Sequence, residues 1–325
     1  MLRTVFFGTP ELAVPSLERA ASTTNLLAVV TQPDRPRGRG LKPEPPPVKR
    51  WAETHGIPVL QPTKINDGTL EQQLRDLQPD LCLMAAYGRL LKQPLLDVPP
   101  LGWLNVHPSL LPRWRGPSPI QTAILEGDPV TGVTIMRVAL EMDAGDIVLQ
   151  ESVPIGPEET AGELTERLAE LGAALLEKAI HMAEAGTIAA TPQNHAEAVY
   201  CRLFEKKDGR IRWSDPAVRI HNLVRAANPW PTAYYLFRGE LFKILKTSVV
   251  AEPAGAEPGV ITAVEKKRLL VATGEGTLAI FRAQLPGRKP LDMEAFLPGA
   301  RVRAGERFTE VPEPPGDSTG GGNLE

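Results

Sequence analysis

Residues 3–20 read RTVFFGTPELAVPSLERA. The run Thr4-Val5-Phe6-Phe7 is continuously apolar apart from its threonine, which is typical of a buried strand, and it ends at Gly8. Leu12, Leu17 and Ala20 then recur in a helical pattern. A buried strand that turns directly into a helix is the repeating unit of α/β proteins. A dinucleotide fingerprint would place three glycines at this turn. Only Gly8 is there and no P-loop occurs, which argues against nicotinamide-dependent enzymes and NTPases.

The same alternation of strands and helices continues through the first half of the chain. Further buried strands are expected at 26–30, 58–60, 80–86 and 103–106, two antiparallel edge strands at 130–138 and 146–153, and one long helix at 160–185. Apolar strands separated by helices predict a Rossmann-like α/β domain with a mostly parallel sheet and helices on both faces.

Beyond residue 205 the pattern changes to short strands separated by Gly and Pro. These strands are expected at 234–237, 241–247, 259–264, 269–272 and 277–283. They predict a small β-barrel, which we interpret as the oligonucleotide-binding type. The predicted organisation is a catalytic domain at 1–186, a linker at 187–205, a barrel at 206–311 and a disordered tail at 312–325.

Composition narrows the class of protein. At 325 residues the chain is long enough for two domains, and its 42% hydrophobic and 23% charged residues are ordinary for a globular protein. Cys82 and Cys201 form no CxxC pair, so we expect neither a disulfide framework nor a cysteine-rich metal site. We see no signal peptide and no apolar run long enough for a membrane span, and we therefore expect a cytoplasmic protein that binds no membrane. We also expect a monomer.

Charge is distributed unevenly along the chain. The net charge is −3, but residues 1–201 hold 17 basic and 24 acidic residues, whereas residues 202–310 hold 19 basic and 12 acidic residues. Such an asymmetry is either incidental or a sign of a polyanionic partner.

The segment richest in candidate catalytic residues is NVHPSLLPRWRG at 105–116. Asn105 and His107 are two residues apart at the end of a predicted parallel strand, where α/β sheets bind their ligands. One side chain offers an amide donor and the other a titratable imidazole. A lone histidine is more often structural than catalytic. The other four histidines resemble surface or linker residues, however, and the neighbouring Asn105 favours a catalytic pair.

A second polar segment, EMDAGDIV at 141–148, lies between two predicted strands. Its Asp and Gly residues suit an ordinary hairpin turn, and it lacks the ligand spacing of an EF-hand. The functional alternative is that one aspartate reaches the Asn–His pair, where a carboxylate would orient the imidazole and favour its charged form.

Two further stretches are basic. The segment 34–50 holds six basic and two acidic residues punctuated by Gly and Pro, and we interpret it as a long mobile loop. Arg37, Arg39 and Lys42 suit contacts with phosphates and bases. In the C-terminal domain, Lys206, Lys207 and Arg210 precede Trp213, a pattern that suits nucleic-acid backbone contact and stacking.

Five segments together resemble the folate-dependent N-formyltransferase superfamily, and within it the methionyl-tRNA formyltransferases. They are FFGTPELAVPSL at 6–17, TQPDRPRGRG at 31–40, the 105–116 block, PIQTAILEGD at 119–128 and MDAGDIV at 142–148. The resemblance implies that Asn105, His107 and Asp143 are the catalytic residues, and that the tetrahydrofolate moiety contacts Ser109, Leu110, Leu111 and Pro112. It also implies that the basic loop reaches the acceptor end of the tRNA, although its Pro-rich continuation from Leu41 varies among family members.

The resemblance therefore implies transfer of a formyl group from 10-formyltetrahydrofolate to the amino group of charged initiator methionyl-tRNA, with no metal. The amine has a reference pKa of about 8, so it needs no strong base. We assign Asn105 and His107 to the oxyanion and to proton transfer, and Asp143 to orienting His107. Two alternatives remain. One is a formyltransferase for a nucleotide sugar or for glycinamide ribonucleotide, and the other is a non-catalytic tRNA-binding protein on the same scaffold.

Overall fold

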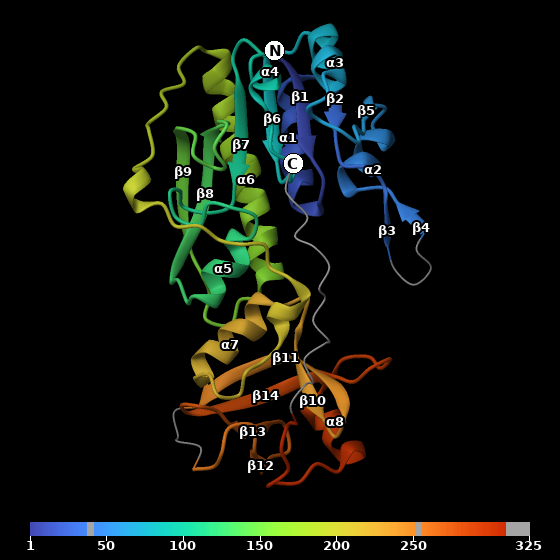
Figure 1. The fold of residues 1–325 in the computed structure, drawn as a ribbon, viewed down its shortest axis with the longest axis vertical. Coiled ribbons are helices and arrows are strands. Elements are labelled where there is room, and N and C mark those ends of the chain that lie inside the picture. The colour runs from blue at the N-terminus through green and yellow to red at the C-terminus, as the bar shows by residue number, and fades with distance from the viewer. Residues whose placement is uncertain (38–41, 251–254, 310–325) are drawn as a thin grey trace. The chain divides into compact units, whose positions relative to one another are not determined.

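The computed structural model describes residues 1–37, 42–250 and 255–309 (Figure 1). The chain divides into two compact units between Phe204 and Glu205. Each unit is described below by itself. The predicted tail at 312–325 lies outside the described residues, as does Arg39 of the basic segment.

The first unit is built on a seven-stranded mixed sheet, as predicted. The strand order is β5-β2-β1-β6-β7-β8-β9. The pairings β7–β8 and β8–β9 are antiparallel, and the other pairings are parallel. The strands are β1 (Arg3–Gly8), β2 (Asn25–Val30), β5 (Val59–Leu60), β6 (Leu81–Ala85), β7 (Trp103–His107), β8 (Val130–Arg137) and β9 (Ile147–Pro154). The chain order reverses between β1 and β6, where open α/β sheets bind their ligands beyond the carboxyl ends of the strands.

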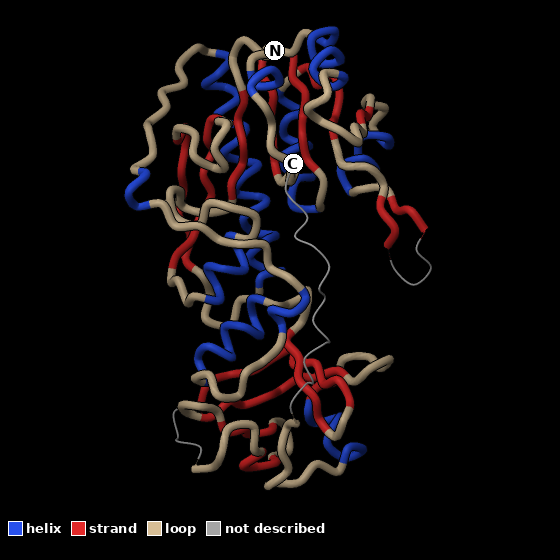
Figure 2. The backbone as a smooth tube through the Cα atoms, viewed as in Figure 1, coloured by secondary structure: helices blue, strands red, loops and turns tan. Residues whose placement is uncertain are grey.

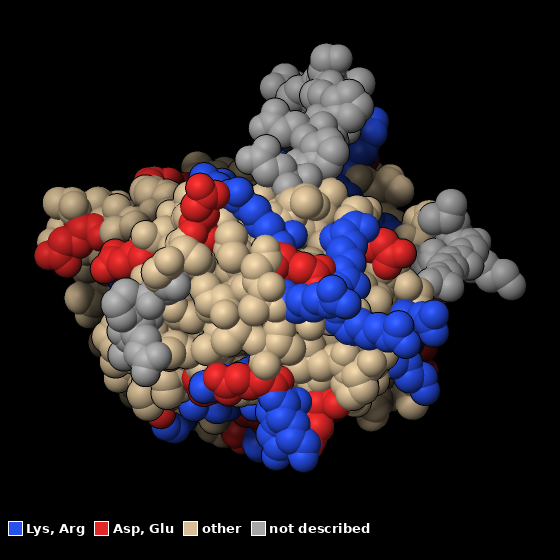
Figure 3. All heavy atoms as spheres, turned by 90° about the horizontal axis from the view of Figure 1, so that it is seen from below, with Lys and Arg blue, Asp and Glu red and all other residues tan. Residues whose placement is uncertain are grey.

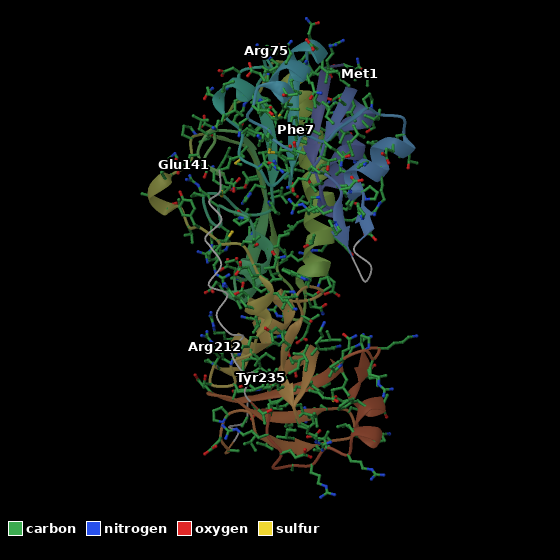
Figure 4. The ribbon with its side chains drawn as sticks, turned by 45° about the vertical axis from the view of Figure 1, so that its right-hand side comes forward. Met1, Phe7, Arg75, Glu141, Arg212 and Tyr235 are labelled. Atoms are coloured by element: carbon green, nitrogen blue, oxygen red, sulfur yellow. The ribbon has the colours of Figure 1, made fainter. Side chains whose placement is uncertain are left out.

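Helices cover both faces of this sheet (Figure 1). They are the 3-10 helix η1 (Glu11–Ala13), α1 (Val14–Thr23), α2 (Pro47–Thr54), α3 (Thr69–Leu77), α4 (Gln93–Leu96), α5 (Pro119–Leu125) and α6 (Ala161–Glu184). Leu70, Leu74 and Leu95 of α3 and α4 pack with Phe7 and Trp103 on one face. Phe7, labelled in Figure 4, meets the Trp103 ring edge-on at 4.7 Å. The other face is covered by α1 and α6, which lie against each other.

Helix α6 is the predicted long helix and packs directly behind β7. Thr160 caps it, because the Thr160 hydroxyl accepts from the N–H of Glu163 while the Glu163 carboxylate accepts from the N–H of Thr160. At Gly172 a side chain would lie 2.6 Å from Cγ1 of Val106. The glycine therefore allows the helix to approach the strand that carries Asn105 and His107.

The basic segment is not simply a long loop, contrary to expectation. Strands β3 (Arg35–Arg37) and β4 (Lys42–Glu44) form a two-stranded antiparallel hairpin, and α2 begins at Pro47. Pro36 and Pro43 lie opposite each other in the hairpin. Proline removes a backbone donor and is tolerated only where a strand edge is free, and both strands of an isolated hairpin have a free edge.

The segment 187–204 is mostly loop, with the 3-10 helix η2 (His195–Glu197) near its middle (Figure 2). It nevertheless makes specific contacts with the first unit. Thr191 exchanges two backbone hydrogen bonds of 2.8 Å with Ile147 at the start of β9, and Cys201 donates its N–H to the carbonyl of Arg115 at 2.8 Å.

The second unit is a closed antiparallel barrel, which confirms the predicted β architecture. Its strands, in the order β10-β11-β14-β13-β12 with β15 beside β14, are β10 (Ala233–Phe237), β11 (Glu240–Val250), β12 (Ile261–Val264), β13 (Leu269–Ala272), β14 (Thr277–Gln284) and β15 (Leu291–Asp292). Its helices are η3 (Lys206–Gly209), α7 (Ala217–Ala226) and α8 (Met293–Ala300). Residues 306–309 pair with both sheet edges, because Thr309 donates to Leu236 beside one edge and Phe308 donates to Gly259 beside the other.

An aromatic cluster fills this barrel. Phe308 belongs to the closing segment 306–309. The centroid of its ring lies 4.8 Å from that of Trp213, 5.2 Å from that of Phe237 and 5.5 Å from that of Phe242. The expectation that His221 is a surface or linker residue is wrong. It is buried in α7, and its Nδ1 lies 2.9 Å from the hydroxyl of Thr247.

Among residues 1–37, 42–250 and 255–309, no helix combines the length and the apolar character that crossing a lipid bilayer requires.

Candidate active site

The site begins at the carboxyl end of β7. Val106 faces α6, as its approach to Gly172 shows, so its neighbours Asn105 and His107 occupy the opposite face of the strand. Asn105 is half-buried, and its carboxamide has no hydrogen-bond partner among the residues that the structure describes. Its two N–H donors are therefore available to a bound molecule.

His107 is only 4% exposed, and one of its ring nitrogens is already occupied. Nε2 lies 2.9 Å from the carbonyl oxygen of Trp114. A carbonyl can only accept, so Nε2 carries a proton and Nδ1 is the nitrogen left to exchange one. Nδ1 faces Oδ2 of Asp143 at 3.7 Å, which is ion-pair distance but beyond a hydrogen bond. The direct hydrogen bond that orients the ring is thus the one to Trp114.

Asp143 lies in the turn between β8 and β9 with its backbone in the left-handed region, at a φ of 51°. Asp tolerates this conformation better than most residues. Its Oδ2 accepts the N–H of Gly116 at 2.8 Å, so one carboxylate oxygen touches the 105–116 block and faces His107. The structure therefore brings Asp143 together with His107, from segments 36 positions apart in the sequence.

Trp114 is also left-handed, at a φ of 60°, which is costly for a bulky residue, about 1–3 kcal/mol. Its indole N–H donates to Asp128 at 2.6 Å, and Arg113 lies over its ring while binding the same carboxylate at 2.6 Å. These contacts hold the residue whose carbonyl fixes His107. The strain is therefore stored next to the imidazole.

The segment predicted to contact folate, Ser109 to Pro112, follows His107 directly. Its backbone is organised by Thr134 of β8, whose hydroxyl donates to the carbonyl of Ser109 at 2.7 Å and accepts the N–H of Leu111 at 3.2 Å. Gln150 of β9 donates to the Leu111 carbonyl at 3.0 Å and to the Thr134 hydroxyl at 2.8 Å. Side chains of β8 and β9 thus form hydrogen bonds with the backbone of this segment. The half-buried side chains of Leu110 and Pro112 offer apolar surface for a ligand.

Several residues that complete the site come from the segment predicted to be a linker. Arg115 is fully buried and donates to Oε1 of Gln193 from Nε at 3.1 Å and from Nη2 at 2.8 Å. It also donates to the hydroxyl of Tyr200 at 3.2 Å. Glu141, labelled in Figure 4, accepts from Tyr200 at 3.2 Å. Sequence reasoning missed Gln193 and Tyr200 because 187–205 has no apolar period or known motif.

The residues predicted to bind tRNA lie in both units. Arg37, the last residue of β3, and Lys42, the first residue of β4, are paired in the backbone register of the hairpin. In the second unit, Lys206 and Lys207 are exposed in η3, Lys207 is paired with Glu205 at 2.6 Å, and Arg210 is half-buried beside Tyr234. Figure 3 shows one end of the molecule, where Lys and Arg side chains form separate groups with acidic side chains beside them.

Both thiols are buried and free. Burial raises the pKa of the Cys82 thiol well above its usual value, and it also raises the pKa of the Cys201 thiol, which accepts the N–H of Ser118 at 3.4 Å. Within the described part of the chain, no three His, Cys, Asp or Glu side chains are grouped as a metal would require.

Comparison with known proteins agrees with this geometry. Residues 2–180 match the formyl transferase family model, and residues 204–301 match the model of the formyl transferase C-terminal domain. The methionyl-tRNA formyltransferase of Alkaliphilus oremlandii is 42% identical over 310 residues, covering 95% of this chain and 100% of that protein. The methionyl-tRNA formyltransferase of Chloroflexus aggregans is 44% identical over 303 residues, covering 93% and 98%.

A solved structure shares the fold at lower identity. The N-formyltransferase of Helicobacter canadensis, in complex with folinic acid and dTDP-3-aminofucose, superposes with a TM-score of 0.65 at 22% identity. It covers 88% of this chain and 100% of its own. Taken with the full-length relatives at 42% and 44% identity, these matches establish that the chain belongs to the methionyl-tRNA formyltransferase family.

Proposed function

We propose that this chain transfers the formyl group of 10-formyltetrahydrofolate to the free amino group of initiator methionyl-tRNA. Asn105, His107 and Asp143 carry the reaction in this proposal. The observation that supports it most directly is that the unpaired Asn105 carboxamide and the Nδ1 side of His107 share one face of β7, with the Asp143 carboxylate beside that nitrogen.

Asn105 acts on the charge that develops during acyl transfer. When the amine attacks the formyl carbon, the carbonyl oxygen becomes an oxyanion, and a donor fixed in advance stabilises it at no reorganisation cost. The carboxamide of Asn105 has no partner among the described side chains, and it is attached to a central strand of the sheet. It therefore offers a donor that is both free and rigid.

His107 and Asp143 handle the proton. The attacking amine must lose a proton as the new C–N bond forms, and the leaving nitrogen of the donor must gain one as the old C–N bond breaks. Because Nε2 stays bonded to Trp114, His107 accepts and returns this proton at Nδ1. The imidazolium formed in between lies 3.7 Å from Oδ2 of Asp143, which stabilises its positive charge.

The formyl donor supplies an activated formyl group on nitrogen. The half-buried Leu110 and Pro112 offer an apolar surface for its ring system, next to the buried Ser109 and Leu111. A protein of this fold, the Helicobacter canadensis N-formyltransferase, is in complex with folinic acid, which supports a folate as the formyl donor.

Two observations favour tRNA as the acceptor. The full-length relatives are methionyl-tRNA formyltransferases. In addition, residues 202–310 carry an excess of seven basic residues, and the hairpin at 35–44 contributes further basic residues from the N-terminal half. Basic side chains supply the sequence-independent part of nucleic-acid affinity.

One assay separates this proposal from its alternatives. The protein is incubated with 10-formyltetrahydrofolate and, in parallel, with charged initiator tRNA, charged elongator tRNA, an amino-sugar nucleotide or glycinamide ribonucleotide. We expect formylation of charged initiator tRNA. Formylation of a small amine alone would replace the proposed acceptor, and tRNA binding without formylation of any amine would leave a non-catalytic tRNA-binding protein.

A further inference from the structure

We propose that Gln193 is a positioning residue that holds Asp143 in its working conformation, with Arg115 fixing the orientation of Gln193. This inference rests on the proposed role of Asp143. It assigns a catalytic purpose to the segment 187–204, which the sequence presents only as a connection between two domains.

The turn that carries Asp143 has an unfavourable backbone conformation. Asp143 is left-handed at a φ of 51°, which costs even a tolerant residue free energy relative to the right-handed conformation. Two residues later, a side chain on Gly145 would overlap the carbonyl oxygen of Arg137, so the turn also runs tightly against β8. A conformation of this kind persists only where surrounding contacts impose it.

Gln193 provides those contacts. Its Nε2 donates to the carbonyl of Asp143 at 2.9 Å and to the carbonyl of Gly145 at 2.7 Å. A carboxamide nitrogen has two N–H groups, so each carbonyl receives one. The side chain thus bridges both ends of the strained turn, and it is buried from solvent that could compete for these bonds.

Arg115 determines which way the carboxamide of Gln193 faces. Arginine has donors and no acceptor, so the group that meets its Nε and Nη2 must be the oxygen of Gln193. The nitrogen is then forced toward the turn. Although the amide orientation of a glutamine is ordinarily ambiguous, here it follows from the chemistry of the neighbouring side chain.

The guanidinium of Arg115 is suited to this task because it is fully buried and has several partners. It donates to Gln193 and Tyr200 and lies 3.5 Å from the exposed carboxylate of Glu141. Its backbone N–H donates to Val199 and its carbonyl accepts from Cys201, so the arginine is paired with the same segment on both sides of Tyr200.

The consequence for the reaction follows from the position of the Asp143 carboxylate. With the turn left-handed at Asp143, that carboxylate accepts the Gly116 N–H and lies 3.7 Å from Nδ1 of His107. Without the two bonds from Gln193 the turn relaxes and the carboxylate leaves Nδ1 of His107. Displacing a catalytic group by about 1 Å can cost roughly 100-fold in rate.

The test is Gln193→Glu, which has the same shape. One carboxylate oxygen still accepts from Arg115, but the other replaces the NH2 group and faces two carbonyls that it cannot bond. We expect kcat for formyl transfer to fall about 10- to 100-fold, with both KM values changed less than about twofold. A residue needed only for packing or for satisfying Arg115 would leave kcat unchanged.

Two further variants separate positioning from charge. Gln193→Met is neutral and removes both donors, so it should lower kcat as Gln193→Glu does, even where the loss of the Arg115 partner also lowers stability. Gln73→Glu adds the same charge at an exposed position on α3 and should leave kcat at the wild-type value.

A double-mutant cycle with Asp143→Asn tests whether Gln193 affects kcat through Asp143. If Gln193 acts through Asp143, adding Gln193→Glu to Asp143→Asn lowers kcat less than about twofold further. Wild-type kcat in Gln193→Glu, or an undiminished loss in the Asp143→Asn background, would overturn the inference. Wild-type kcat in Asp143→Asn itself would instead refute the proposed role of Asp143.

Discussion

The 105–116 block and the hairpin at 35–44 both extend from the carboxyl ends of parallel strands of the same sheet, yet they are built in opposite ways. In the block, His107, Trp114 and Arg115 are buried and bonded to one another or to distant segments. In the hairpin, β3 and β4 pair with each other, and Arg35 makes an exposed hydrogen bond to Gln32. The difference separates two demands: chemistry needs groups fixed in advance, whereas capture of a large polyanion needs reach and charge.

The largest expected effect comes from removing the catalytic side chains that we assign to the 105–116 block. We expect Asn105→Ala and His107→Ala each to lower kcat about 100- to 1000-fold, because each removes a preorganised group from the transition state. Steady-state formylation rates and thermal melts check the result. His55→Ala, on the exposed end of α2, is the control and should retain full activity. Near-normal turnover in either site variant would refute the assignment.

A second prediction concerns the support behind the folate segment. Thr134→Val keeps the shape of the side chain and removes its hydrogen bonds to Ser109, Leu111 and Gln150. With each bond contributing about 0.5–1.5 kcal/mol, we expect the KM for the formyl donor to rise roughly tenfold. Thr131→Val makes the same change on the same strand, and its KM should match the wild type. An unchanged donor KM in Thr134→Val would mean that the segment is organised without Thr134.

The hairpin should behave differently. Replacing Arg37, Arg39 and Lys42 with Gln should raise the KM for tRNA severalfold and leave kcat near the wild-type value. The slope of log(kcat/KM) against log[salt] should become shallower by up to about 2–3 units, because up to three phosphate contacts are lost. Replacing Arg19, Arg75 and Lys178 with Gln makes an equal charge change elsewhere in the first unit. A fall in kcat for the hairpin variant would remove the distinction between the two regions.

The smallest expected effect concerns the two thiols. Burial raises the pKa of both Cys82 and Cys201, so little thiolate is present near neutral pH. We expect a thiol reagent such as DTNB at pH 8 to react with the native protein much more slowly than with the denatured chain. Fast labelling of Cys201 would show that the segment next to Arg115 opens readily, which would contradict the rigidity described for this region.

The sequence predicted the sheet well because short continuous apolar runs such as 81–85 are typical of buried strands. It also placed Asn105 and His107 on one side of a strand end from their spacing alone. It could not place Asp143 without the family resemblance, because contact across 36 residues leaves no local signal. The hairpin was missed because Pro36 and Pro43 usually argue against strands. Gln193 and Thr134 were missed because their importance lies entirely in what they contact after folding.

The close approach of α6 to β7 at Gly172 has a practical consequence for genetics. A methyl group at this position would push on Val106, one residue from each of Asn105 and His107, although Gly172 lies on the opposite side of β7 from those two side chains. The packing of this methyl group against Val106 depends on temperature. Gly172→Ala is therefore a rational starting point for a heat-sensitive allele. Such an allele would let cells lose this activity on a temperature shift while every residue of the reaction centre remains unaltered.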